Sequence, residues 1–276
     1  MKPFHRSQNA AMPRLQASLS TAQQHRTSAS SKKAGNTPPY PPRLQAVVDY
    51  IQNHADLVGN GLPMYYEVSS ELQTPIPAVM QGLTSDVILQ EVTGKQQAIN
   101  TVQAFPAPAR HFADVLAALM FVGGGGLDYA HNLVTPLSWG SRTNYAGPSV
   151  PGSAAAREAA YVHALIHRAE GFCDGEFGSG FSNANYWYTA AAAATHPISQ
   201  PLLLDIKFLA KGKPRLEALV NSYGEYFAPS KFVTSCSQAL TTKDLEILSF
   251  CKNAAKSEWH LLFRHCYTRL VDELNM

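Results

Sequence analysis

The segment PGSAAAREAAYVHALIHRAEG, residues 151–171, decides the fold class of this chain. A Pro-Gly pair interrupts the chain at its start, Ser153 follows as a helix N-cap, and Gly171 stands where helices commonly end. Apolar residues recur between them at three- and four-residue intervals, at Ala159, Val162, Ile166 and Ala169. This spacing is typical of one buried helix face, so the segment predicts an amphipathic helix over residues 153–170.

The same spacing and the same punctuation by glycine and proline extend on both sides of this segment. They predict further helices that begin at Leu44 and that cover 112–122, 127–134, 183–195, 214–226 and 242–274. Only short pieces, such as residues 86–89, alternate as a strand would, and no repeat of 20–50 residues is evident. The predicted fold class is therefore all-α, a multi-helix bundle.

Charge divides the 276 residues into an arm and a body. Residues 1–48 carry seven basic residues and no acid, whereas the remainder carries 15 basic and 20 acidic residues. Ser, Gln, Ala and Pro dominate residues 1–42, which cannot bury an apolar face. We predict a disordered basic arm over 1–42 and a single helical metal-binding domain over 43–276. A mildly acidic body argues against nucleic acid as a partner.

The apolar runs and the cysteines bear on the compartment. No run approaches the 18 or so apolar residues that a membrane span needs, which argues against a membrane protein. The four cysteines form no Cys-x-x-Cys pair, so we interpret them as reduced thiols and expect a cytoplasmic protein. The acid-free basic N-terminus also fits a mitochondrial transit peptide, which remains the alternative.

Three residues within the segment 151–171 are candidates for a chemical role. His163, His167 and Glu170 are spaced i, i+4, i+7, within about 60° of one another around a helix and beside its buried face. Arg157 and Arg168 are expected on a solvated face. Inward imidazoles and carboxylates are costly unless satisfied, and a bound metal ion would satisfy them. Hydrogen bonds to other side chains are the alternative, because His-x-x-x-His also arises by chance.

His131, in the short helix predicted after the four glycines 123–126, could supply a third imidazole to this metal site. The alternative is that it only packs or caps there. His111 and His196 are weaker candidates because they lie at predicted helix ends. The glycines lack the Gly-Lys-Ser/Thr ending of a phosphate loop and are read as a connector. No Gly-x-Ser-x-Gly elbow supports a serine nucleophile.

Two motifs together resemble a known family. Residues 163–171 read His-Ala-Leu-Ile-His-Arg-Ala-Glu-Gly and residues 183–187 read Asn-Ala-Asn-Tyr-Trp. They are similar to a helical, hemocyanin-like family in which His-Ala-x-x-His-Arg-x-Glu-Gly precedes Asn-Ala-x-Tyr-Trp. Residues 127–132 and 258–263 look like the family's upstream Ala-His segment and its C-terminal Glu-Trp-x-Leu-Leu-Phe. The resemblance spans about residues 115–270.

The characterised type in this family is the fungal zinc-dependent cyclopenase. The resemblance implies a bundle like the central domain of hemocyanin and a Zn²⁺ site formed by His131, His163 and His167. It implies an enzyme, a lyase of alkaloid biosynthesis, that contracts a cyclopenin-type 6,7-bicyclic benzodiazepine to a viridicatin-type quinolone with loss of methyl isocyanate. Glu170 would move a proton or serve as a fourth ligand.

A small aromatic alkaloid is the partner that this resemblance implies, and the glycine-rich segment after Gly171 would face it. The substrate-binding residues expected there are Phe177, Phe181 and Tyr186; an ordinary helix connection is the alternative. Dicopper sites need two sets of three histidines, and this chain has only one His-x-x-x-His pair of that kind. Two alternatives stay open, a non-catalytic helical scaffold and a copper or iron oxygen-binding metalloprotein.

Overall fold

The computed structural model of this chain describes residues 39–59, 75–94, 105–139, 148–175 and 178–275. These residues form an all-α structure whose sheet content is one two-residue hairpin, which confirms the predicted fold class. In chain order the elements are α1 (Pro42–His54), η1 (Ala78–Met80), α2 (Ser85–Thr93), α3 (Ala107–Gly124), α4 (Leu127–Ser138), α5 (Ala156–Glu170), β1 (Asp174–Gly175), β2 (Gly178–Ser179), α6 (Gly180–Ala190), η2 (Ala193–Thr195), α7 (Ser199–Ala210), α8 (Pro214–Asn221), α9 (Pro229–Thr242) and α10 (Leu245–Glu273).

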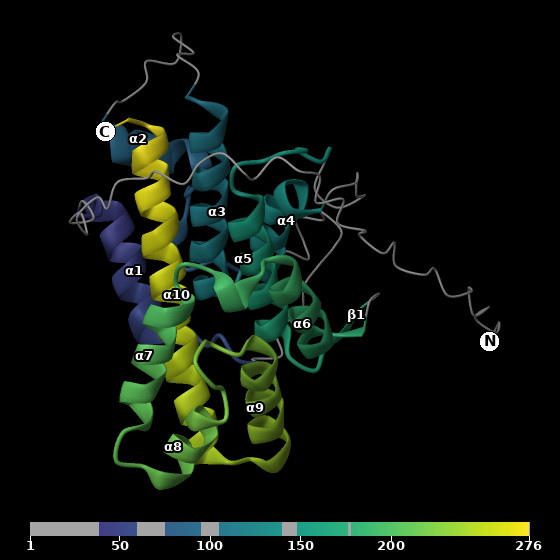
Figure 1. Cartoon of the computed structure of the whole chain (residues 1–276). Coiled ribbons are helices and arrows are strands. Elements are labelled where there is room, and N and C mark those ends of the chain that lie inside the picture. Colours follow the sequence, from purple (N-terminus) through teal and green to yellow (C-terminus); the bar gives the residue numbers. More distant parts are fainter. Residues whose placement is uncertain (1–38, 60–74, 95–104, 140–147, 176–177, 276) are drawn as a thin grey trace, which may run out of the picture. The chain divides into compact units, whose positions relative to one another are not determined.

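Helices α10 and α5 each pack against several other helices of the bundle. The C-terminal helix α10 runs alongside α3 and also packs against α7 and α9 (Figure 1). Helix α5 lies between α4 and α6 and makes its most extensive contact with α6. The buried apolar side chains of all these helices form one continuous core. Helix α5 therefore has partners on several sides, and those partners decide which of its polar residues meet.

The apolar stretch predicted over 112–122 lies at the centre of this core. In α3 the residues from Val115 to Met120 are fully buried, so the helix has no solvated face over that stretch. The indole of Trp259 in α10 donates a hydrogen bond to the carbonyl of Leu119 at 2.7 Å. At Gly123 a Cβ atom would meet the Ile51 side chain at 2.6–2.8 Å, so glycine permits α1 to approach α3 closely.

Several element boundaries differ from the sequence expectation. Residues 86–89 are helical, because Thr84 caps α2 by accepting a hydrogen bond from the backbone N–H of Val87. Helix α4 continues past Pro136 to Ser138. Helix α6 begins at Gly180, three residues before the predicted start, and ends at Ala190. Packing against α5 therefore outweighs the low helix propensity of these glycine and serine residues.

The predicted basic arm, residues 1–42, lies almost wholly outside the described residues, and α1 begins at Pro42. Tyr40, at its end, packs edge-on against Phe263 and Tyr267 of α10, with ring centroids 5.3 and 4.8 Å away. No helix among the described residues is long and apolar enough to cross a membrane. The four cysteines are unpaired.

Candidate metal centre

Three histidines meet where α4 packs against α5. His131 comes from α4, and His163 and His167 come from successive turns of α5. One potential ligand atom from each lies within 4.8 Å of the other two. The centroids of the His131 and His163 rings are 4.7 Å apart, and those of His163 and His167 are 5.6 Å apart with parallel planes. The structure thus brings together all three histidines that the sequence predicts as metal ligands.

The three imidazoles are buried, with exposed fractions of 7% for His131, 0% for His163 and 2% for His167. Burial, together with the nearby His167, lowers the pKa of His131 to about 3. Burial, and then His131 and His167, hold the pKa of His163 well below its usual range. His131 and His163 are therefore neutral imidazoles at physiological pH, the form that binds a metal ion.

Two hydroxyl groups of α4 fix which nitrogen of each ring carries the proton. The Ser138 hydroxyl donates to the carbonyl of Val134 at 2.8 Å and lies 2.9 Å from Nδ1 of His163. The Thr135 hydroxyl donates to the carbonyl of His131 at 2.6 Å and lies 3.3 Å from Nδ1 of that residue. Each hydroxyl has used its only hydrogen, so it can only accept from the ring. Nδ1 therefore carries the proton in both histidines, and Nε2 carries a lone pair.

Glu170 fixes the third ring in the same way. Its Oε2 atom lies 2.7 Å from Nδ1 of His167, and a carboxylate can only accept from that nitrogen. Nδ2 of Asn183 in α6 lies 3.2 Å from Nε2 of His167, where an amide N–H meets a lone pair. Glu170 thus sits behind His167, on the Nδ1 side, and is not part of the three-nitrogen group. This is the place of a carboxylate that orients a metal-binding histidine.

Close packing of α6 on α5 brings the other motif residues to the site. At Gly180 a Cβ atom would lie 2.4 Å from the carbonyl oxygen of His167 and 2.7 Å from Cβ of Glu170. The glycine therefore lets the first turn of α6 touch the last turn of α5. About two turns later Trp187 stacks on His163, with centroids 4.0 Å apart and planes 8° from parallel.

The residues expected to bind substrate have different fates. Phe177 lies outside the described residues. Phe181 is 5% exposed and packs edge-on against Phe172, with centroids 5.0 Å apart. Tyr186 is 37% exposed and stands edge-on to Trp187 at 5.3 Å. Tyr186 is thus linked through Trp187 to His163 and remains accessible, whereas Phe181 is a core residue.

The expectation that Arg168 is solvated is wrong. Arg168 and Glu258 of α10 are both completely buried and form an ion pair. Tyr161 and Tyr188 donate to Oε1 of Glu258 at 3.0 and 2.9 Å, and Arg168 Nε donates to the carbonyl of Leu57 at 3.1 Å. Burial next to the carboxylate raises the pKa of both tyrosines well above its usual value. A helical period cannot reveal a charge that is satisfied by a partner 90 residues away.

Sequence reasoning missed the residues behind the histidines. Thr135 and Ser138 follow His131 at i+4 and i+7, which is a signal for one helix face. Because Pro136 predicts the end of the helix before it, the face that His131 shares with Thr135 and Ser138 does not follow from the predicted element. Asn183 and Trp187 belong to the motif that carries the resemblance, but nothing in their spacing indicates which histidine each would contact.

Three buried imidazoles of this kind can hold a metal ion. A tetrahedral zinc ion with bonds of about 2.0–2.1 Å needs donor atoms about 3.4 Å apart, which small side-chain movements from separations under 4.8 Å would provide. Among the described residues this is the only group of three histidines; the second potential metal group contains two histidines and a glutamate. The described part of the chain therefore lacks the two three-histidine sets of a dicopper site.

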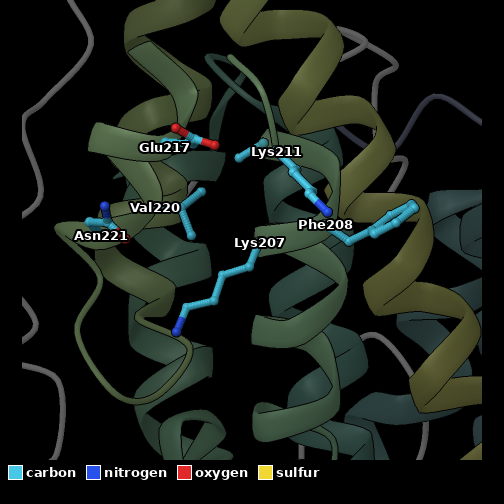
Figure 2. Close-up of a pocket in the computed structure, with 7 residues that line it drawn as sticks. Lys207, Phe208, Lys211, Glu217, Val220 and Asn221 are labelled. Atoms are coloured by element: carbon cyan, nitrogen blue, oxygen red, sulfur yellow. The ribbon is translucent and has the colours of Figure 1, made fainter. Parts of the chain in front are cut away.

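A groove of about 360 Å³ lies apart from these histidines, between α7 and α8. Lys207, Phe208 and Lys211 line one side, and Glu217, Val220 and Asn221 line the other (Figure 2). Its lining contains no imidazole and no thiol. The groove offers lysine, glutamate and asparagine side chains but no pair of metal ligands, so the histidine cluster remains the candidate centre.

Comparison with known proteins found no match for this chain: no family model, no curated protein and no solved structure is similar to it.

Proposed function

We propose that this chain is a metal-dependent enzyme whose metal ion is held by His131, His163 and His167. The observation that carries the proposal is the fixed tautomer of all three rings. Thr135, Ser138 and Glu170 lie at the three Nδ1 positions, so each ring keeps its lone pair on Nε2, and one potential ligand nitrogen of each ring lies within 4.8 Å of the other two. A metal ion can bind three neutral imidazoles at once, and at His167 it would replace the 3.2 Å contact of Asn183 with Nε2.

Zinc is the ion that we propose. Three neutral imidazoles with an open fourth position are the donor set of a catalytic zinc site. When bound, such an ion acts as a Lewis acid that polarises a carbonyl oxygen. Copper and iron also accept imidazole, but an oxygen-binding dicopper centre needs a second set of three histidines, which the described residues do not provide.

The reaction that we propose is the lyase reaction implied by the resemblance. It contracts a cyclopenin-type benzodiazepine to a viridicatin-type quinolone and releases the methylated amide unit as methyl isocyanate. This change is an elimination with no net oxidation or reduction, so it needs neither an oxidant nor a redox-active metal. The support is the set of motif residues 163–171 and 183–187, which the fold places on two helices in direct contact.

The chain's own residues would prepare this site in three ways. Glu170 holds the His167 ring by accepting from its Nδ1–H, so we assign it a positioning role. Trp187 covers one face of His163 and limits the access of water to that ring. Tyr186, accessible and edge-on to Trp187, offers an aromatic surface beside the site for an aromatic substrate.

The test is turnover of cyclopenin by the zinc-loaded protein, followed by detection of the quinolone product. We expect turnover that chelation abolishes and zinc restores, and no turnover with His163→Ala. The matched control is His54→Ala, which removes an exposed imidazole of α1 far along the chain from the site. A zinc-loaded wild-type protein without turnover would contradict the substrate while leaving the metal site intact. A protein that binds no metal would favour a non-catalytic scaffold.

A further inference from the structure

A second cluster of metal-binding side chains lies on another face of α5. Glu158 belongs to the first turn of that helix, His196 follows η2, and His265 belongs to α10. Oε1 of Glu158 lies 3.1 Å from Nε2 of His265 and 4.0 Å from Nε2 of His196. The three ligand atoms are all within 4.8 Å of one another. These residues take no part in the centre described above.

The fold holds this cluster in place through the segment 191–196. Arg157 donates from Nε to the carbonyl of Ala191 at 3.0 Å and from Nη2 to the carbonyl of Ala192 at 3.1 Å. Ala192 has a φ of 46°, a left-handed conformation that is costly for alanine. The contacts of Arg157 stabilise that turn, which directs His196 back toward α5. The His196 ring lies edge-on to His265 with centroids 5.0 Å apart.

One atom of the cluster is buried and unsatisfied. The His196 side chain is 0% exposed, and its Nε2 has no hydrogen-bond partner among the described residues. The hydroxyl of Ser199, whose backbone N–H donates to the His196 carbonyl, is also buried and without a partner there. Buried polar atoms are nearly always paired, because leaving one unpaired costs about 1–3 kcal/mol. An unpaired imidazole nitrogen beside a carboxylate and a second imidazole points to a missing ligand.

We propose that Glu158, His196 and His265 form a second metal site, which takes a divalent ion of the zinc class. Two imidazoles and one carboxylate are the protein ligands of one common type of zinc site, whereas Mg²⁺ and Ca²⁺ prefer oxygen ligands alone. The separations of 3.1 and 4.0 Å bracket the 3.4 Å or so between donors around a tetrahedral zinc ion. A bound ion would give His196 Nε2 the partner that it lacks.

The metal-free alternative is a simple hydrogen-bonded pair. Without a metal, His265 and Glu158 still form their 3.1 Å contact, and Nδ1 of His196 accepts weakly from the backbone N–H of Ile198 at 3.4 Å. Metal binding at Nε2 moves the His196 proton to Nδ1 and gives up that long hydrogen bond. The metal-free arrangement leaves Nε2 of His196 unsatisfied, whereas a bound ion would give His196, His265 and Glu158 a common partner.

The test counts metal ions on the full chain. Protein stripped with a chelator is titrated with Zn²⁺ against a chromophoric competitor, for wild type, His196→Gln, His265→Gln and the control His54→Gln. We expect two equivalents for wild type and the control, and one for each cluster variant with an unchanged helical circular dichroism spectrum. Wild type that binds one equivalent, lost in His163→Ala, would overturn the proposal, as would folded cluster variants that bind two.

A second measurement needs no variant. Crystals of the wild-type chain grown with Zn²⁺ are measured at the zinc absorption edge, and an anomalous difference map locates the ions. We expect a peak about 2.0–2.1 Å from Nε2 of both His196 and His265. A map with ions at the three-histidine centre but none between these two rings overturns the proposal.

Discussion

At the scale of single residues, the candidate centre depends on three groups that touch no metal. Thr135, Ser138 and Glu170 each accept from an Nδ1–H, which leaves the lone pair of each ring on Nε2. A partner of this kind fixes the tautomer and the ring orientation of a ligand histidine, and its loss typically costs 10–100-fold in metal affinity.

We therefore predict that Ser138→Ala and Glu170→Ala each weaken zinc binding about 10–100-fold without unfolding the chain. The dissociation constant from competition with a chelator is the measurement. Ser237→Ala is the matched control, because that serine also donates to a backbone carbonyl of its own helix and forms no hydrogen bond with a histidine of the described residues. Glu170→Gln, which keeps an acceptor for Nδ1–H, should bind nearly as well as wild type. Equal affinities in all four variants would contradict the orienting role.

How much of the site the sequence reveals depends on what each residue contacts. His163 and His167 share one helix face, so their proximity follows from the helical period alone. His131 lies on a different predicted helix, so its contact with His163 depends on how α4 packs on α5 and does not follow from local spacing. The helical period predicts a solvated Arg168, which is wrong because its partner Glu258 lies in another helix. Local period predicts faces of helices; it does not predict pairs across the core.

At the scale of elements, the contact of α5 with α6 decides whether Asn183 and Trp187 reach the histidines. Gly180 is the point of closest approach, where a Cβ atom has no room against the backbone of His167. Backbone cannot move aside as a flexible side chain can, so a larger residue must shift α6 away.

Gly180→Ala is accordingly predicted to weaken zinc binding at least several-fold and to lower the thermal midpoint. The affinity change follows from displacement of Glu170, whose Cβ would lie 2.7 Å from the added methyl group, and from loss of the Trp187 contact with His163. Gly94→Ala serves as the control. It introduces strain at a φ of 64°, but its Cβ would have open space, so only stability should fall. Unchanged zinc affinity in Gly180→Ala would show that the position of α6 does not matter to the site.

The buried ion pair between α5 and α10 yields a second prediction at this scale. Removing one partner of a buried pair leaves an uncompensated charge and typically costs about 3–5 kcal/mol. We expect Arg168→Met to lower the free energy of unfolding by that amount in urea titrations. Arg168→Met/Glu258→Leu should cost less than the two single changes together, because neither charge remains. Arg110→Gln, in the exposed pair with Asp86, should change it by less than about 1 kcal/mol. Additive single and double changes would contradict this account.

The presence of a helix is predicted more accurately from the sequence than the residues at which it begins and ends. Periodicity and end signals predicted most of the helices, including α5 and the long α10. They predicted no helix for α7 or α9. Two other predictions failed, at α2, where four alternating residues lie within a capped helix, and at the start of α6, where glycine and serine are helical because α5 covers them. In both cases a contact from outside the window, or a cap at its edge, overrode local preference.

At the scale of the whole molecule, the buried histidines couple stability to pH. Burial lowers the pKa of His131 and of His196 from 6.5 to about 3, so both stay neutral in the folded chain well below the pH at which the unfolded chain protonates them. The unfolded state therefore binds more protons between about pH 6.5 and pH 3, and each histidine lowers the free energy of unfolding as pH falls through that interval.

For the metal-free protein we predict a loss of up to about 1.4 kcal/mol per pH unit per buried histidine below pH 6.5. Urea unfolding at pH 7.5, 6.5, 5.5 and 4.5 gives the slope. His131→Gln, which removes one such group, should flatten it, whereas His54→Gln at an exposed position should not. A free energy of unfolding that stays constant from pH 6.5 to 4.5 would contradict neutral, buried His131 and His196 in the folded chain.

The central claim is that His131, His163 and His167 hold a metal ion, and metal content tests it most directly. Wild type, His163→Ala and His54→Ala are purified without added chelator, and zinc, copper and iron per chain are measured by mass spectrometry. We predict zinc in the wild-type chain and in His54→Ala, and the loss of one equivalent in folded His163→Ala. A wild-type chain without metal that also binds none when zinc is added, or a His163→Ala chain with full metal content, would contradict it.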